Sequence, residues 1–129
     1  MVSPPIPKYR SLNQPIILCL EFHVQYLCIM FLYNVTVGID KDVELEWLEW
    51  MKDEHIPKVL ETGMFTSYKI YKVLHDQAEG SVSYSVQYFA ETINHVTEYF
   101  DKFAPALMEI HRSRFQDKHV AFMTLLEEV

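Results

Sequence analysis

Cysteine is nearly absent from this chain. Its 129 residues include two cysteines, Cys19 and Cys28, and both lie in the first 28 residues. A disulfide framework or a cysteine-based zinc site needs several cysteines in the folded part of a chain, so neither can form after residue 28. So few cysteines are typical of a reducing compartment, and we therefore expect a cytoplasmic location.

Positive charge is also scarce. Lysine and arginine together number 11 against 18 aspartates and glutamates, which leaves a net charge of -7. Nucleic acids and anionic membrane surfaces bind proteins through basic residues that neutralise phosphates. The charge balance therefore disfavours both, and we expect neither nucleic acid nor membrane among the partners.

Motifs for phosphate binding, nucleophilic catalysis and metal binding are missing as well. With three glycines in all, the sequence has no P-loop, no GxGxxG and no GxSxG pattern. His95, His111 and His119 lack the close spacing and the acidic neighbours of a metal site. We predict no metal and no cofactor.

Apolar residues, by contrast, are present in the amount expected of a folded domain. Half of the residues are hydrophobic and 14% are aromatic, a composition that excludes a disordered chain. A length of 129 residues is sufficient for one core.

Residues 1–29 differ in character from the remainder. Four prolines fall within the first 15 residues, and the apolar stretch that follows them is interrupted by Glu21. Three interpretations stay open: translation that begins at Met30, an additional real segment, or an export or membrane-anchoring sequence. The first is favoured, because the apolar block before Glu21 is too short for a membrane span or a secretion signal. We predict a non-domain extension over residues 1–29 and one domain over residues 30–129.

The predicted domain repeats one pattern, a strand followed by a helix and a second strand. Apolar and polar side chains alternate in the strands, and each helical apolar pattern is interrupted by a proline, Pro57 or Pro105. We expect the first helix to stop near His55, and Gly63 to end the short turn after Pro57. The four predicted strands are residues 31–39, 64–74, 81–89 and 120–126.

This order predicts an α+β fold of the ferredoxin-like βαββαβ plan, with two helices on one face of a four-stranded antiparallel sheet. The other face has no helix to cover it. Bare apolar edge strands promote aggregation, and a second copy packed sheet against sheet is the simplest cover, so we predict a homodimer. The apolar residues expected on this helix-free face are Phe65, Tyr71, Val73, Ala121, Met123 and Leu125.

Two longer motifs resemble a small bacterial family of unknown function. They are WLEWMKDEHIPKVLETGMF at residues 47–65 and YNVTV at residues 33–37. The segments YSVQY, residues 84–88, and VAFMTLLE, residues 120–127, fit the same family. The resemblance covers residues 30–129 and brings no assigned activity with it.

More distantly, the chain is similar to the dimeric α/β barrel superfamily, through Trp50, His55 and Pro57 at the predicted end of the first helix. This resemblance implies a homodimer and a pocket between the helices and the sheet. Superfamily members include cofactor-free monooxygenases, haem-degrading enzymes, small isomerases and proteins without known catalysis. The resemblance therefore does not select a reaction.

Candidate site residues follow from the predicted pocket. His55 is a weak candidate for catalysis, as a general acid or base at the pocket mouth; a structural role at a helix end is the alternative. Tyr33, Tyr68 and Tyr84 are expected under the helices with Tyr88, either as an aromatic slot or as ordinary strand residues. The predicted ligand-binding residues for a small aromatic ligand are Trp50, His55, Tyr33, Tyr68 and Tyr84.

Two functions are compatible with these observations. The favoured one is a non-catalytic homodimeric domain that binds a small molecule or serves a structural role, because the sequence shows no nucleophile, metal set or paired acid and base. The alternative is a cofactor-independent monooxygenase- or isomerase-like enzyme that acts on a small aromatic or quinone-like substrate. A large cavity in which His55 and a tyrosine hydroxyl converge favours the enzyme, and a filled interior favours the structural role.

Overall fold

A computed structural model describes residues 29–75 and 78–129 of the chain. Residues 1–28 lie outside the described residues, and with them nearly all of the predicted non-domain extension over residues 1–29. The compact unit discussed below comprises Met30–Glu128.

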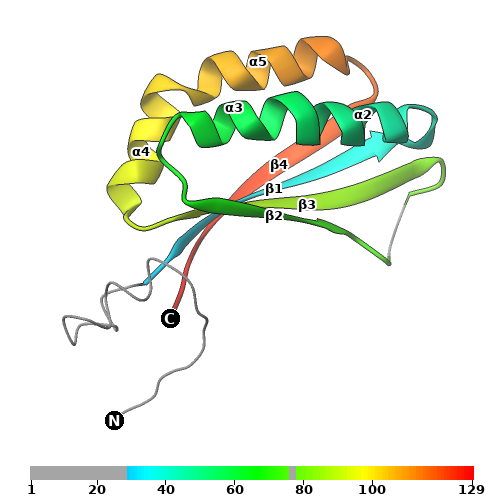
Figure 1. Cartoon of the computed structure of the whole chain (residues 1–129). Coiled ribbons are helices and arrows are strands. Elements are labelled where there is room, and N and C mark those ends of the chain that lie inside the picture. Colours follow the sequence, from blue (N-terminus) through cyan, green and yellow to red (C-terminus); the bar gives the residue numbers. More distant parts are fainter. Residues whose placement is uncertain (1–28, 76–77) are drawn as a thin grey trace. The chain divides into compact units, whose positions relative to one another are not determined.

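The described elements run in the order strand, helical region, two strands, helical region and strand (Figure 1). The strands are β1, Phe31–Asp40; β2, Ser67–Lys72; β3, Ser81–Ala90; and β4, His119–Glu127. The α-helices are α2, Glu44–Trp50; α3, Ile56–Glu61; α4, Ile93–Lys102; and α5, Ala104–Arg114. A 3-10 turn, Lys41–Val43, precedes α2, and a π-helical turn, Met51–His55, joins α2 to α3.

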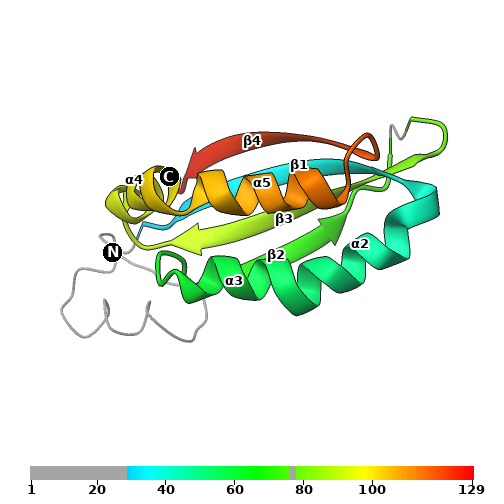
Figure 2. The same cartoon turned by 90° about the horizontal axis from the view of Figure 1, so that it is seen from above.

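The four strands form one antiparallel sheet in the order β2-β3-β1-β4. This confirms the predicted α+β class with a four-stranded antiparallel sheet. In Figure 1 the helices lie together above the sheet, and the described chain places no helix below it. Seen from above the helices, β4 runs along an edge that α5 leaves uncovered (Figure 2).

The core lies between the sheet and the helices and is rich in aromatic side chains. Trp47 of α2 is fully buried, and its ring lies 5.2 Å from that of Tyr84 on β3. At the opposite end Phe65 stacks on Tyr33 with ring centroids 5.9 Å apart and meets Tyr99 edge-on at 4.9 Å. Such pairs add to the free energy that burial of apolar area already provides.

The first helical region does not stop at His55, and this prediction is wrong. The chain stays helical from α2 through the π-helical turn into α3, and the amide of Ile56 donates to the carbonyl of Met51, five residues earlier. Pro57 has no N–H to donate, and its ring would collide with a carbonyl one turn back in a regular helix. The widened turn accommodates it without ending the helix. Gly63, with a φ of 79°, follows α3 as predicted.

The second helical region consists of two separate helices, α4 and α5. Phe103, with φ -120° and ψ -37°, separates α4 from α5, and Pro105 lies in the first turn of α5. A proline is well tolerated at that position, because the first amides of a helix have no intrahelical partner.

The predicted phase of the last strand is wrong by one residue. Leu125 lies opposite Tyr33, and Met123 lies opposite Val35, so both point to the helix side of the sheet together with Ala121. Six of the seven residues from 120 to 126 are apolar, so no alternation indicates which face is which, and a slip of one residue exchanges the faces. Phe65, also predicted on the helix-free face, is 6% exposed and belongs to the core.

The helix-free face therefore carries other apolar residues of β4 than those predicted. Val120, Phe122 and Leu126 are 73%, 64% and 44% exposed there. The neighbouring central strands carry a hydrogen-bonded polar row instead, in which the Ser85 hydroxyl donates to Asn34 Oδ1 at 2.6 Å. A strongly apolar edge thus adjoins a polar centre on one open surface.

A chain that begins at Met30 should unfold at the same denaturant midpoint as the full chain, because the interactions described above are contained within Met30–Glu128. Equilibrium unfolding of the two proteins, followed by tryptophan fluorescence, tests this expectation. A loss of several kcal/mol or an insoluble product would show that the preceding segment is part of the fold.

Candidate functional site

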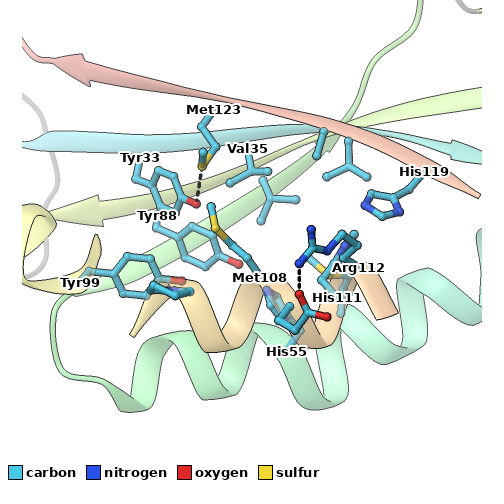
Figure 3. A pocket seen from close by; sticks show the side chains of 16 residues that line it. Tyr33, Val35, His55, Tyr88, Tyr99, Met108, His111, Arg112, His119 and Met123 are labelled. Carbon is cyan, nitrogen blue, oxygen red and sulfur yellow. Dashed lines mark hydrogen bonds and ion pairs between the residues drawn. The ribbon is translucent and has the colours of Figure 1, made fainter. Parts of the chain in front are cut away.

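A cavity of about 460 Å³ lies between the helices and the sheet (Figure 3). It is bordered by the π-helical turn and α5 on one side and by β1, β3 and β4 on the other. The cavity lies above Val35 of β1. This residue is only half-buried, although its neighbours on the same face of the strand, Tyr33 and Val37, are 3% and 2% exposed. The lining residues are Tyr33, Val35, Val37, Met51, His55, Val86, Tyr88, Tyr99, Pro105, Met108, Glu109, His111, Arg112, His119, Ala121 and Met123.

One end of the cavity is formed by tyrosines, at the left of Figure 3. The hydroxyl of Tyr33 donates to the sulfur of Met123 at 3.2 Å, a weak acceptor, and burial raises the pKa of Tyr33 to about 12. Burial also raises the pKa of Tyr88 and of Tyr99, so all three phenols are protonated at neutral pH. Tyr88 and Tyr99 are each 2% exposed, and their hydroxyls make no hydrogen bond with any described residue.

The other end contains His111 and His119, whose ring centroids are 4.6 Å apart. The indole N–H of Trp47 donates to Nε2 of His111 at 2.9 Å. Nδ1 of His119 lies 2.8 Å from the carbonyl oxygen of Phe115. Burial first, and then the neighbouring His119 and His55, lower the pKa of His111 to about 3, which leaves its ring uncharged at neutral pH.

His55 lies in the cavity wall between these ends. Its ring stacks on Trp50 with centroids 5.0 Å apart and meets His111 edge-on at 5.7 Å. Burial, with a smaller contribution from Lys58, lowers the pKa of His55 to about 4. The alternative role for His55 at a helix end does not apply, because the helix continues past His55.

The charged residues of the lining form a pair at the rim. Arg112 makes an ion pair with Glu109, three residues earlier on α5, and the hydroxyl of Ser113 donates to the same carboxylate at 3.0 Å. Both charged side chains are more than half exposed. Surface pairs of this kind contribute little free energy, but the pairing leaves the rim close to neutral.

Two of the five predicted ligand-binding residues, Tyr33 and His55, line the cavity. Trp50 is buried behind His55, against which it stacks. Tyr84 faces the core further along β3 and donates to Glu44, and Tyr68 lies half-buried on β2; neither borders the cavity.

Several lining residues escaped the sequence reasoning. His111 lies four residues after Leu107 and four before Phe115, both of which pack on the core, so it continues the inward stripe of the helix. That spacing was a usable signal. His119 and Met123 do not follow from the predicted phase of the last strand, which is wrong by one residue.

Among residues 29–75 and 78–129, no three His, Cys, Asp or Glu side chains are arranged to hold a metal ion. In the same part of the chain, no helix is both long enough and apolar enough to cross a membrane.

Comparison with protein families gives a match to the model described as Domain of unknown function (DUF4286), over residues 30–129. The chain belongs to the DUF4286 family. This confirms the resemblance to a family of unknown function, and the match covers the whole of the described compact unit. No curated protein matches this DUF4286 chain.

Solved structures resemble the DUF4286 domain in fold. An ethyl tert-butyl ether d (EthD) family protein from Bacillus halodurans has a TM-score of 0.58 at 7% identity, with 77% of this chain and 99% of that chain covered. A dimeric ferredoxin-like protein from an uncultured marine organism has a TM-score of 0.50 at 12% identity, with 78% of this chain and 96% of that chain covered. At such identities the likeness is one of fold alone, and the fold is ferredoxin-like.

The two half-buried histidines, His55 and His111, predict a loss of stability in mild acid. Their folded pKa values, about 4 for His55 and about 3 for His111, lie below the unfolded value of 6.5, so the unfolded chain binds protons first as the pH falls. Their contribution to stability is complete well above pH 6.5 and declines below it, by about 1.4 kcal/mol per histidine between pH 7.5 and 5.5.

The variant His111→Gln isolates this effect, because glutamine does not titrate and can still accept from Trp47. Urea unfolding at both pH values should show a stability loss smaller by about 1.4 kcal/mol in the variant than in the wild type. Equal losses in the two proteins would show that His111 titrates normally in the folded state.

Proposed function

We propose that this DUF4286 domain is a homodimeric small-molecule-binding protein whose ligand occupies the cavity. The observation that carries the proposal is the cavity itself, about 460 Å³ and open to solvent beside β4, where Met123 and Met108 are 48% and 38% exposed. Small-molecule sites are concave and lined mainly by apolar side chains with a few polar groups. An apolar groove of this size on a small domain marks a binding site more often than a structural feature.

Unpaired polar groups in the cavity wall support the same proposal. The hydroxyls of Tyr88 and Tyr99 and the ring nitrogens of His55 have no hydrogen-bond partner in the described part of the chain. Buried polar groups are almost always paired, and an unpaired one costs about 1–3 kcal/mol. A bound ligand or ordered water that reaches these groups would recover that free energy.

The remaining lining indicates a small, flat and mainly apolar ligand. Six of the sixteen lining residues are methionines from three elements, Met51, Met108 and Met123, and valines from β1 and β3. Thioethers are polarizable and adapt to aromatic rings, which they contact favourably. The volume is in the range of sites for small molecules and cofactors.

The helix-free face supports assembly into a dimer. Val120 and Phe122 are mostly exposed on β4, an edge strand without a lysine or a proline from Val120 to Leu126. Edge strands of soluble proteins are usually guarded or covered, and a symmetric copy is the commonest cover. The similar marine protein is described as dimeric.

An enzyme is the second candidate, because His55 and Tyr33 border one cavity. Catalysis by His55 needs a partner that orients or polarises the ring. The ring of His55 stacks on Trp50 and meets His111, and the carboxylate of the lining, Glu109, is held by Arg112 and Ser113. Binding without catalysis is therefore the better supported function.

Filling the cavity should abolish ligand binding without unfolding the domain. The change Val35→Phe places a larger apolar side chain in the space above β1, while the matched change Val35→Ala enlarges the space. Indole and naphthol at 100 times their Kd should stabilise the wild type and Val35→Ala by about 2.7 kcal/mol, and Val35→Phe should show no such gain. Thermal unfolding with each compound measures this, and the absence of any gain in the wild type would contradict the proposal.

A charge on the helix-free face should dissociate the dimer. The change Phe122→Asp would bury an unpaired carboxylate in the interface, at a cost of several kcal/mol. Leu45→Asp on α2 is the matched control, because Leu45 is 76% exposed and lies on the opposite, helical layer. Sedimentation velocity should give a wild-type and control dimer and a Phe122→Asp monomer; a dimeric Phe122→Asp variant would locate the interface elsewhere.

A further inference from the structure

The hydrogen bond between Trp47 and His111 determines which nitrogen of His111 carries the proton. An indole N–H can only donate, so Nε2 of His111, at 2.9 Å from it, must accept. An uncharged imidazole has one N–H and one bare nitrogen. His111 therefore carries its proton on Nδ1, and the bond to Trp47 excludes the other tautomer as well as the doubly protonated ring.

This Nδ1–H is not used within the described chain. His111 borders the cavity, whereas Trp47, which occupies its Nε2, is fully buried and does not. No described residue accepts a hydrogen bond from Nδ1 of His111. A half-buried donor without an acceptor gains free energy when a ligand supplies one.

Besides the tyrosines, the titratable groups of the cavity lining are two further histidines and one ion pair. His55 and His119 are the titratable groups in ring contact with His111, and burial holds the pKa of His55 near 4. The charge of Arg112 at the rim is already balanced by Glu109. A ligand carboxylate would have to displace Glu109, and a ligand ammonium would face Nδ1–H without an acceptor, so both are penalised by desolvation.

We infer that His111 is a ligand-contacting residue that offers Nδ1–H as a fixed, uncharged donor, and that the cavity takes a small uncharged aromatic carbonyl compound. The carbonyl oxygen accepts from His111, and the aromatic body lies among the methionine and valine side chains. The tyrosine hydroxyls at the far end are available to further acceptors of a longer ligand. This inference rests on the proposed binding function and adds to it the ligand class and the residue that selects it.

Two variants of His111 separate a ligand-contacting role from a structural one. In His111→Gln the side-chain amide reaches the place of Nε2, so it keeps the bond to Trp47 and loses the donor at Nδ1. In His111→Asn the amide reaches the place of Nδ1, so it keeps the donor and loses the bond to Trp47. A structural role therefore penalises asparagine, and a ligand-contacting role penalises glutamine.

The experiment measures the binding of acetophenone, benzoate and benzylamine to the full chain and to both variants by isothermal titration calorimetry, with melting curves as a check on folding. Acetophenone should bind the wild type, and more tightly than either charged compound. Its affinity should fall about fivefold in His111→Gln, the loss of one neutral hydrogen bond, and should be retained in His111→Asn even though that variant melts at a lower temperature.

Each contrary result identifies what has failed. Equal affinity of acetophenone for the wild type and His111→Gln, or tighter binding of benzoate, would overturn the assignment of His111 and of the ligand class. The proposed function would stand in that case if indole or naphthol still binds. Failure of acetophenone, indole and naphthol alike would overturn the proposed function, and this inference with it.

Discussion

The hydrogen bond from Trp47 to His111 connects the two helical regions that cover one face of the sheet. The residues are 64 positions apart, one on α2 and the other on α5, and Trp47 also packs against Tyr84 beneath it. An indole as completely buried as this one needs an acceptor, because an unpaired N–H would cost about 1–3 kcal/mol. The same contact sets the spacing of the helices, the orientation of a cavity-lining ring and the tautomer of that ring.

Irregular helix geometry is the second element on which the cavity depends. Met51 and His55 belong to the π-helical turn that accommodates Pro57, and Pro105 and Met108 belong to the first turns of α5. All four line the cavity. The prolines thus mark where two helices depart from regular geometry above the sheet, and π-helical turns of this kind occur frequently at functional sites.

The edge strand β4 links the cavity to the outer surface of the domain. Its residues alternate between the cavity side, with Ala121 and Met123, and the helix-free face, with Val120 and Phe122. Apart from the half-buried His119, every residue of the strand is exposed. A partner that covers β4 would therefore act on both surfaces, and this would couple the proposed assembly to the proposed ligand binding.

The sequence by itself determined the α+β class, the four strands, the interruption of each helical region at a proline, and the family. Each of these is a local pattern of period 2 or 3.6 or a contiguous motif. It also identified Tyr33 and His55, which follow from strand alternation and a motif. Only the tertiary structure decided the phase of β4, since six apolar residues in seven leave no alternation to read. It alone brought His111 beside Trp47 and His55, because contacts between residues so distant in the chain depend on how the helices pack on the sheet. The same packing decides which buried polar groups remain without a partner.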